Sequence, residues 1–407
     1  MENITQIEYL FPKTVDWTTW LQQKADVPFS ESVIEFLNAL SQSLLHDPSS
    51  RAFSDMVTFA FFCRRANMQK QKERYTAEQV VLGKGLIFHI APSNVPINFA
   101  YSLVAGLIAG NYNIVRVSSK TFPQVDIVIR HIAGLADTYP EVAQRIILVR
   151  YDHESNANKV FSAACQMRVV WGGERTIATL RENALAPRAT EICFADRYSL
   201  AVIQADKLVG ETNMPALAEK FYNDTYLFDQ NACTAPHLIV WLGQAAHIAK
   251  GKELFWNAVH QYVIDHYRNM QDVMTVDKLT AMCRQAIKTD IRCEQTADNY
   301  LNRVELNTLN KDIEDYRCLG GYFAEYTASA LSEIAPIVNS KYQTLSYYGL
   351  EQEELKQFVQ EQRLSGIDRI VPIGETTAFS FTWDGYNLIQ QMSRIIDINN
   401  KDTNHTK

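Results

Sequence analysis

Apolar positions recur every three or four residues through the first 80 residues of the chain, which is the spacing of one face of an α-helix. Val33, Phe36, Leu37 and Leu40 follow this pattern. From Gly85 onward the pattern changes to short, continuous apolar runs, which are typical of buried strands. The N-terminal segment is therefore predicted to be mostly helical, and the rest of the chain to contain a sheet.

Residues 86–117 have the pattern of one strand–helix–strand crossover. Leu86–Ile90 and Asn113–Val117 are the two strand candidates, and the helix between them is predicted to end at Gly110-Asn111. Ser93 or Asn94 would cap the start of that helix. Because such a crossover joins parallel strands, it favours a parallel sheet.

Later apolar runs extend this sheet pattern. Further strands are predicted at Ile146–Val149, Met167–Trp171, Leu200–Ile203, Leu238–Trp241, near Ile337 and at Arg369–Ile373. Helical patterns lie between most of these runs, and residues 250–365 read as helix-rich. The alternation predicts an α/β protein.

Length and charge narrow the class of protein. A chain of 407 residues is long for one core, so two or three lobes are expected. The net charge of −7 argues against a nucleic-acid partner, because phosphate binding needs clustered positive charge.

The longest apolar stretch, Ile97–Ala109, is shorter than the ~20 residues of a membrane span. The N-terminus has no basic region followed by an apolar run, so no signal peptide is expected.

Seven cysteines are scattered along the chain, at positions 63, 165, 193, 233, 283, 293 and 318. An odd number without the spacing of a small disulfide-rich domain suits a reducing compartment, so a cytoplasmic location is expected. No CxxC pair and no HExxH sequence occurs, and no metal site is predicted.

Cys233 differs from the other cysteines in its neighbours. It lies in the run Phe228-Asp-Gln-Asn-Ala-Cys-Thr-Ala-Pro-His237, a polar loop directly before an apolar strand. Loops held by a rigid scaffold often present reactive groups. The other six cysteines read as small buried hydrophobic residues. Spacing alone leaves both a catalytic and a structural reading of Cys233 open, and His237 is near it without being an evident base.

The crossover also carries candidate chemistry. No GxGxxG sequence follows its first strand. Asn94 is explained either as a helix cap or as an amide donor to a developing oxyanion. Arg116 and Lys120 flank Ser118 and Ser119 at the end of the second strand. These four residues suit a site for a nucleotide phosphate or ribose. An equally good explanation is that they are charged and polar residues of a solvent-exposed loop without a ligand.

Taken in order, these segments resemble the aldehyde dehydrogenase superfamily, and within it the LuxC-like fatty acyl-CoA reductases. The resemblance covers about residues 80 to 390 and is carried by His89–Pro96, by Ala109–Asn111 with Ile114–Thr121, by Trp171–Thr176, by Asn231–Ala235, and by Gly366–Gly374 with Trp383–Gly385. It implies an α/β, aldehyde dehydrogenase-like fold with a parallel-sheet cofactor domain, a second α/β catalytic domain and a helical N-terminal segment.

The resemblance also implies domain limits and site residues. Residues 1–205 would hold the helical segment and the NADP-binding domain, 206–370 the catalytic thiol domain, and 371–407 a C-terminal return segment and tail. Cys233 would be the nucleophile and Asn94 an oxyanion donor. The cofactor residues implied are Pro92, Ser93, Arg116, Ser118, Ser119, Lys120, Gly172 and Gly173.

Two departures from the wider superfamily refine this expectation. Aldehyde-oxidising members use a glutamate to activate water, and that position falls near Cys193, with Glu191 two residues out of register. The missing base favours a reductase. Where NAD-preferring relatives carry a glutamate, this chain has Ser119 followed by Lys120, with Arg116 upstream. A serine leaves room for a 2′-phosphate and a lysine attracts it, so NADPH is the expected cofactor.

The resulting hypothesis is an NADPH-dependent reduction of a long-chain fatty acyl-CoA, or of an acyl-protein thioester, to the aldehyde through a thioester on Cys233. Two alternatives stay open: an NAD(P)-dependent aldehyde dehydrogenase acting oxidatively, and a catalytically inactive acyl-binding relative. The resemblance also implies an acyl-protein synthetase as a partner and a homo-oligomer.

Overall fold

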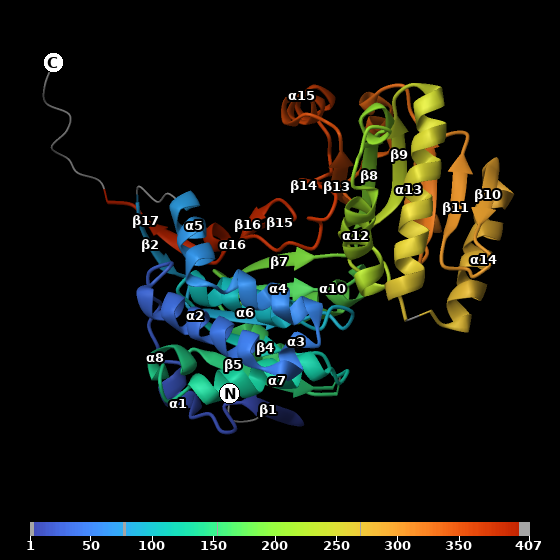
Figure 1. Ribbon diagram of the computed structural model, residues 1–407. Helices are drawn as coiled ribbons and strands as arrows, with labels where there is room; N and C mark the ends of the chain where they lie inside the picture. The colour runs from blue at the N-terminus through green and yellow to red at the C-terminus, as the bar shows by residue number, and fades with distance from the viewer. Residues whose placement is uncertain (1–3, 76–78, 153, 269, 399–407) are drawn as a thin grey trace, which may run out of the picture. The chain divides into compact units, whose positions relative to one another are not determined.

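The computed structural model describes residues 4–75, 79–152, 154–268 and 270–398 (Figure 1). The chain forms two compact units. The first contains the residues up to Ala195 together with those from Phe379 onward, and the second contains Asp196–Ala378. Assigning the cofactor to the first unit and the thiol to the second stays a prediction. The polar tail from Asn399 lies outside the described residues.

The N-terminal segment is mostly helical, as predicted. It contains α1 (Trp17–Trp20), α2 (Glu31–His46), α3 (Pro48–Arg51), α4 (Ser54–Phe62) and α5 (Arg65–Arg74). Helix α2 buries Val33, Phe36, Leu37 and Leu40, the residues whose spacing indicated a helix. Two short strands were not anticipated: β1 (Ile7–Phe11), which pairs with β5, and β2 (Val80–Gly83), which pairs with β17.

The sheet of the first unit has the strand order β1-β5-β4-β3-β6-β7. Its parallel strands are β3 (Leu86–Ile90), β4 (Tyr112–Arg116), β5 (Ile146–Tyr151), β6 (Met167–Trp171) and β7 (Thr190–Phe194), and β1 runs antiparallel to β5. The connecting helices are α6 (Asn98–Ile108), α7 (Pro123–Leu135), α8 (Pro140–Ala143), α9 (Ala157–Ala164) and α10 (Glu174–Arg181). The chain proceeds from β3 to β4 and β5, then returns to the other side of β3 as β6. The order of strands therefore reverses between β3 and β6.

Helix α6 ends where the sequence predicted and begins later than predicted. Gly110 has φ 85°, its N–H donates to Leu107 O at 2.9 Å, and Asn111 N donates to Gly106 O at 3.0 Å, which is a Schellman C-cap. The predicted N-cap was wrong, because Ile97 occupies the cap position without a side-chain hydrogen bond. Asn94 lies outside the helix.

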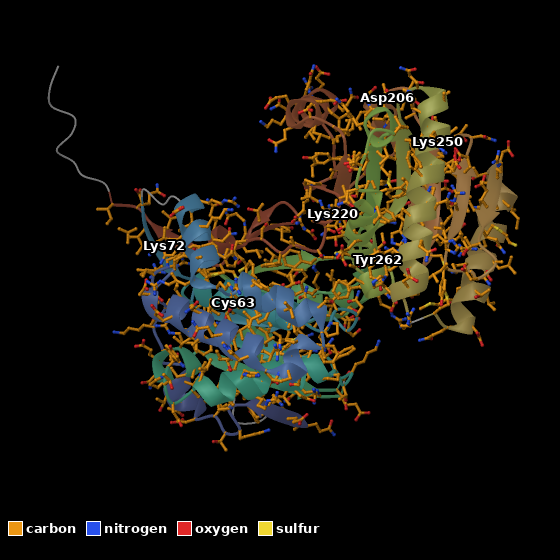
Figure 2. All side chains as sticks on the ribbon, in the orientation of Figure 1. Cys63, Lys72, Asp206, Lys220, Lys250 and Tyr262 are labelled. Atoms are coloured by element: carbon orange, nitrogen blue, oxygen red, sulfur yellow. The ribbon has the colours of Figure 1, made fainter. Side chains whose placement is uncertain are left out.

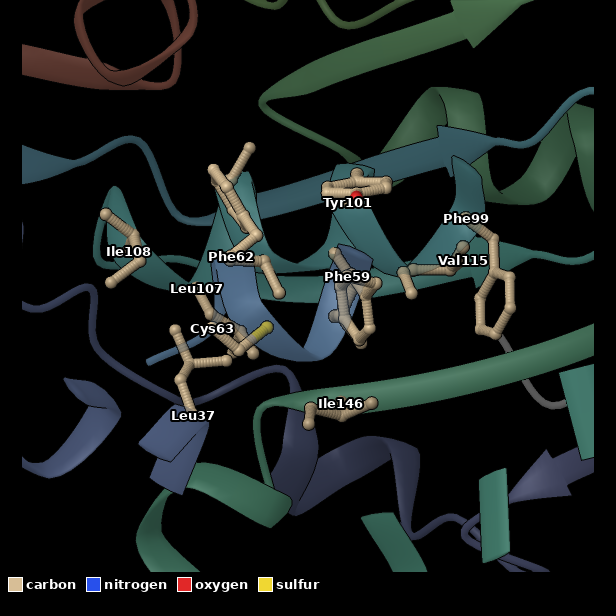
Figure 3. Packing of buried hydrophobic residues seen from close by; sticks show 14 of the residues in the cluster. Leu37, Phe59, Phe62, Cys63, Phe99, Tyr101, Leu107, Ile108, Val115 and Ile146 are labelled. Carbon is tan, nitrogen blue, oxygen red and sulfur yellow. The ribbon is translucent and has the colours of Figure 1, made fainter. Parts of the chain in front are cut away.

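The core of the first unit is a dense apolar cluster. Phe59, Phe62, Tyr101 and Leu107 lie close together around the buried thiol of Cys63 (Figure 3), whose place in the first unit is labelled in Figure 2. The ring of Tyr101 makes edge contacts with Phe59 and Phe62, at centroid distances of 5.0 and 5.3 Å. Helices α4 and α6 are thereby packed against each other over the sheet.

The sheet of the second unit has the order β10-β11-β12-β9-β8-β13-β14. Its strands are β8 (Tyr198–Gln204), β9 (Pro236–Leu242), β10 (Ile291–Gln295), β11 (Asn302–Leu306), β12 (Tyr322–Thr327), β13 (Tyr342–Tyr348) and β14 (Arg369–Pro372). The helices are α11 (Ala205–Leu208), α12 (Met214–Asp224), α13 (Ala245–His266), α14 (Asp272–Lys288) and α15 (Gln352–Gln362), with short 3₁₀ turns η1 (Tyr226–Phe228), η2 (Ile313–Tyr316) and η3 (Leu331–Ile337). Strands β8 and β9 lie at the centre of the sheet.

The sequence was least informative in this unit. The strand predicted near Ile337 was wrong: the segment is the turn η3, and Pro336 inside it lacks the N–H that a central strand needs. Strands β10 to β13 were missed. Strand β13 buries Gln343, Thr344 and Ser346, so it does not read as an apolar run.

The chain returns to the first unit at Phe379. It forms β15 (Thr382–Trp383), β16 (Tyr386–Asn387), α16 (Leu388–Gln391) and β17 (Ser393–Ile396). Phe379 packs on Tyr101 at 4.7 Å and Phe381 on Phe62 at 5.5 Å. Among the described residues, no helix has both the length and the apolar content to cross a membrane.

Candidate active site

Cys233 lies in a turn between η1 and β9, at the amino end of a central strand, and is half-buried. The loop before it is tightly bent. Asp229 and Gln230 both have left-handed backbone conformations, with φ of 54° and 60°. Two consecutive non-glycine residues in this region persist only where the surrounding structure holds them.

The buried side chain of Gln230 stabilises this bent backbone through four hydrogen bonds. Its Oε1 accepts the backbone N–H groups of Gly321 (2.7 Å) and Tyr322 (3.1 Å). Its Nε2 donates to the carbonyls of Pro236 (3.4 Å) and Tyr322 (3.3 Å). One amide thus joins the loop to both β9 and the start of β12.

The backbone of Cys233 itself is anchored by Ser199 of β8. The fully buried Ser199 hydroxyl donates to the Cys233 carbonyl at 2.7 Å and accepts the N–H of Thr344 in β13 at 3.2 Å. Three adjacent strands are therefore linked at the cysteine: β9 follows it, Ser199 of β8 binds its carbonyl, and Thr344 of β13 binds Ser199. A group built into a rigid sheet in this way is held in one orientation.

A second support comes from α14. The ammonium of Lys278, on a side chain that is 1% exposed, donates to the carbonyls of Gly320 (3.0 Å) and Asn299. Gly320 N in turn donates to Asp229 O at 3.2 Å. Burial lowers the pKa of Lys278 to about 8. The ammonium group therefore binds two carbonyls, and one of them belongs to Gly320, the residue that is hydrogen-bonded to the bent loop.

His237 is placed as a structural residue. It is buried in β9 and stacks on Tyr198 with ring centroids 5.7 Å apart. Burial, with a smaller contribution from Arg317, lowers the pKa of His237 to about 3. The imidazole is therefore neutral at physiological pH and is a weak general base.

The other cysteines separate into two groups. Cys63, Cys165, Cys193 and Cys318 are buried or half-buried, and burial raises the pKa of each thiol, to about 11 for Cys193. The expectation that all six are buried hydrophobic residues was wrong for Cys283 and Cys293, which are exposed.

In the first unit, the sheet gathers the predicted cofactor residues at one edge. Pro92, Ser93 and Asn94 follow β3, Ser118 to Lys120 follow β4, and the glycine pair follows β6. Because β4, β3 and β6 are adjacent and parallel, these loops emerge together at the carboxyl edge. Ser93 and Asn94 are exposed there.

The loop after β4 has an inner and an outer part. Arg116 donates from Nη2 to Tyr151 O at 3.3 Å, and its guanidinium lies 5.1 Å from the centre of the Tyr151 ring. The buried Ser118 hydroxyl accepts the N–H of Lys120 at 3.1 Å. Ser119 and Lys120 are exposed. The side chains of Arg116 and Ser118 therefore stabilise the loop from inside, and Ser119 and Lys120 lie on its solvent-exposed side.

Arg150, which the sequence did not single out, adds a cation to this loop. It lies on β5 and donates from Nε to the Ser118 carbonyl at 3.2 Å, while its Nη1 pairs with Glu8 at 3.3 Å. Within the described part of the chain, its Nη2 and the Nε of Arg116 are buried donors without a hydrogen-bond partner. Unsatisfied buried donors beside an exposed lysine fit an anion such as a nucleotide phosphate.

The turn after β6 is open. Gly173 caps α10, and a Cβ atom added at Gly173 would meet no atom within 4 Å, whereas one at Gly172 would lie 3.3 Å from Thr176. The protein itself therefore leaves the space next to the start of α10 unfilled, where backbone N–H groups favour an anion. The β3 and β6 loops flank the reversal of strand order, which is where doubly wound sheets bind nucleotides. The residues present thus fit a dinucleotide.

Glu191 and Cys193, on β7, have a structural arrangement. Glu191 accepts Arg168 Nε at 2.7 Å and Arg181 Nε at 2.8 Å. Burial alone would raise the pKa of Glu191, but the hydrogen bonds from Arg181 and Arg168 lower it below its usual value. A carboxylate held in this way is a poor base, which weakens its candidacy for activating water.

Sequence reasoning missed four residues of this architecture: Gln230, Ser199, Lys278 and Arg150. Gln230 lies in the polar loop before β9, and a polar side chain next to a buried strand was the only sign in the sequence of its structural role. Ser199 and Arg150 act only through contacts with segments more than 30 residues away. Cys233 and Asn94 belong to different units.

Comparison with known proteins adds a family and a fold. The model of the family described as acyl-CoA reductase (LuxC) matches residues 24–395. A long-chain acyl-protein thioester reductase from Photorhabdus laumondii is 20% identical over 314 residues. That alignment covers 76% of this chain and 62% of the relative, so the chain spans less than two thirds of the relative's length.

Solved structures of low sequence identity share the fold. An NAD-dependent benzaldehyde dehydrogenase from Corynebacterium glutamicum is similar with a TM-score of 0.60 and 14% identity, over 97% of this chain and 94% of that one. A 1-pyrroline-5-carboxylate dehydrogenase from Thermus thermophilus has a TM-score of 0.60 and 12% identity, over 93% and 82% of the two chains. The expected α/β, aldehyde dehydrogenase-like fold is thereby confirmed.

Proposed function

We propose, since the chain belongs to the acyl-CoA reductase (LuxC) family, that it reduces a long-chain fatty acyl thioester to the aldehyde with NADPH. The observation that carries the proposal is the loop around Cys233, whose backbone is fixed by two buried side chains: Gln230 within the loop and Ser199 of β8. The similarity to an acyl-protein thioester reductase supports the substrate class.

The first step proposed is acyl transfer to Cys233. The thiolate attacks the thioester carbonyl, the carbon–sulfur bond to coenzyme A or to a partner's thiol breaks, and that thiol leaves with a proton. The Cys233 backbone N–H and the Asn94 side-chain amide are the proposed donors to the oxyanion. The position of Asn94 outside α6 supports this role, since the alternative helix-cap role does not apply.

The second step proposed releases the aldehyde. The carbonyl carbon of the acyl-cysteine receives hydride, which is the chemistry that a reduced nicotinamide supplies when bound. The resulting thiohemiacetal collapses, the bond to the Cys233 sulfur breaks, and the thiol is regenerated. Water must be kept from acting as the nucleophile, and the pairing of Glu191 with two arginines supports the absence of a base there.

NADPH is proposed over NADH from the loop after β4. Ser119 leaves space and Lys120 supplies an exposed cation, while Arg150 and Arg116 have buried donors without partners in the described part of the chain. Pro92, Ser93, Gly172 and Gly173 are proposed to contact the rest of the dinucleotide. An acyl-protein synthetase as acyl donor, and a homo-oligomeric assembly, are further proposals from the family resemblance.

The test is product analysis with matched variants. Purified protein is incubated with NADPH and acyl-CoA of graded chain lengths, and NADPH consumption and aldehyde are measured. We expect aldehyde in a 1:1 ratio with oxidised NADPH, and covalent uptake of radioactive acyl group by the wild type and by Cys193→Ala but not by Cys233→Ala. Equal labelling of the wild type and Cys233→Ala would disprove the covalent step. Reduction of NADP by aldehyde and water, without any acyl-CoA reduction, would favour the oxidative alternative.

A further inference from the structure

A serine, a histidine and an aspartate of the first unit are joined by two hydrogen bonds where α2 packs on α7 (Figure 1). Ser43 lies on α2, His131 on α7, and Asp47 between α2 and α3. The Nδ1 atom of His131 lies 2.5 Å from Ser43 Oγ, and its Nε2 atom lies 2.9 Å from Asp47 Oδ2. A hydroxyl, an imidazole and a carboxylate in this order form the relay of serine hydrolases.

The carboxylate decides where the protons of this relay lie. Hydrogen bonds from His131, and then from Ser49, hold the pKa of Asp47 well below its usual range. An ionised carboxylate only accepts hydrogen bonds, so the Nε2 atom of His131 carries a hydrogen and donates it to Asp47. The Nδ1 atom is then the acceptor, and Ser43 donates its O–H to it. In this tautomer the imidazole can take the proton of the serine.

Asp47 is itself fixed in position. It is the N-cap of α3, and its Oδ1 accepts both the N–H and the O–H of Ser49 at 2.8 Å. Its Oδ2, which faces His131, also accepts Arg130 Nη2 at 2.5 Å. The side chains of Asp47 and His131 are 17% and 12% exposed. The imidazole is therefore oriented by a group that a helix cap holds in place.

Gly134 leaves the surface beside this relay uncovered. It lies on α7, three residues after His131 and four after Arg130, and it is exposed. A Cβ atom added at Gly134 would meet no atom of the described chain within 4 Å. Because a helical side chain leans over the preceding turn, a larger residue here would cover His131 and Arg130. The glycine therefore gives a small molecule access to them.

Arg130 is the donor available to a developing oxyanion. The backbone N–H of Ser43 is bonded inside α2, as in any helix interior, so a donor must come from a side chain. Arg130 is 60% exposed, and its hydrogen bonds to described residues, Asp47 and Ser49, all come from Nη2. Its Nε and Nη1 atoms remain available for an anionic oxygen.

We propose that Ser43, His131 and Asp47 form a second catalytic site, separate from Cys233, that hydrolyses small acyl esters. The Ser43 oxygen attacks the ester carbonyl carbon while its proton passes to His131. The bond to the alcohol breaks, and the alcohol leaves with that proton. A water molecule, deprotonated by His131, then attacks the acyl-serine and releases the carboxylic acid and the free hydroxyl. A short acyl group fits best, because the site lies on an exposed helix surface.

Hydrolysis of p-nitrophenyl acetate tests the site in a Cys233→Ala background, which removes the thiol proposed for the reductase reaction. We expect hydrolysis by Cys233→Ala, and a fall of about a hundredfold in kcat/KM when Ser43→Ala or His131→Gln is added. Ser32→Ala, on the first turn of the same helix, and His46→Gln, an exposed histidine on its last turn, are the matched controls and should leave the rate unchanged. No hydrolysis by Cys233→Ala, or an equal rate with Ser43→Ala added, would overturn the proposal.

A fluorophosphonate identifies the nucleophile, because it transfers its phosphorus to an activated serine with loss of fluoride. In the Cys233→Ala background, mass spectrometry should find the adduct on Ser43, and Ser43→Ala should remove it. Gly134→Leu separates access from folding: the added side chain covers the relay, so labelling should slow roughly tenfold, while leucine in place of a helical glycine should keep or raise the Tm. An adduct on another residue, or unchanged labelling of Gly134→Leu, would contradict the site.

Discussion

Lys120, in the loop after β4, and Arg150, on β5, both form hydrogen bonds with the buried Ser118. Lys120 donates its backbone N–H to the Ser118 hydroxyl, and Arg150 donates to the carbonyl. The charge of Lys120 is exposed, and Arg150 retains a buried donor without a partner among the described residues. At the scale of single residues, we propose that this arrangement favours a cofactor with a phosphorylated ribose.

Removing either charge should therefore change the choice of cofactor. We expect Lys120→Ala and Arg150→Gln each to lower kcat/KM for NADPH by roughly tenfold, because a hydrogen bond to a charged group contributes about 1.5–3 kcal/mol. The value for NADH should change by less than about threefold, since that cofactor lacks the 2′-phosphate. Steady-state kinetics with both cofactors measures the ratio.

Lys159→Ala, an exposed lysine on α9, is the control and should leave both values unchanged. Equal losses with NADPH and NADH would contradict a contact with the 2′-phosphate.

At the scale of elements, the loop before β9 depends on its neighbours more than on its own sequence. The loop is held by the side chain of Gln230, which bonds to β12, by Ser199 of β8, which also bonds to β13, and by Lys278, which bonds to the loop before β12. The buried face of helix α14, through Lys278, therefore also contributes to the position of the thiol loop.

Gln230→Met should loosen this loop while nearly preserving side-chain volume. Four backbone groups lose their partner, and each unsatisfied buried group costs about 1–3 kcal/mol, partly recovered by relaxation. We expect a loss of roughly 2–4 kcal/mol in the free energy of unfolding, together with slower acylation of Cys233. Urea unfolding and single-turnover acyl transfer measure the two effects.

Gln352→Met, an exposed glutamine on α15, is the matched control. A variant that unfolds and acylates like the wild type would show that the amide does not position the loop.

At the scale of the whole molecule, the chain leaves the second unit through a segment held by one buried carboxylate. Asp224 of α12 accepts the N–H of Gly374 at 2.6 Å and of Thr376 at 3.0 Å. Arg369 donates from Nη1 to Thr376 O at 2.8 Å. Burial raises the pKa of Asp224 to about 6, although the backbone donors of Gly374 and Thr376 lower it in part.

This raised pKa predicts a pH dependence of stability. The folded protein binds a proton at Asp224 between the unfolded pKa of 3.8 and about 6, whereas the unfolded chain does not. The contribution of Asp224 to stability is therefore present below pH 3.8 and is lost as the pH rises to about 6. The difference in free energy of unfolding between wild type and Asp224→Asn should change by up to about 3 kcal/mol across this window.

Chemical unfolding of both proteins at intervals of pH measures that difference. A parallel pH profile for the two proteins would show that Asp224 does not titrate in this range.

Several elements could be predicted because their signals are local. The strands β3 and β6 were predicted with the correct limits, since strands buried on both faces read as continuous apolar runs. The C-cap of α6 was predicted because a glycine with positive φ is a local requirement. The N-cap was not, because the turn after β3 continues to Ile97 before the helix begins.

Cys233 could be singled out from the sequence because a polar loop before an apolar strand is a local pattern, and its catalytic role stays a prediction. The sequence alone also determined the α/β class, the helical N-terminal segment and the sheet loops expected to bind the cofactor. Only the tertiary structure decided that Gln230, Ser199 and Lys278 support the thiol loop, and that Glu191 is paired with arginines. Most of these contacts join residues far apart along the chain, and periodicity reports only the neighbourhood of each residue.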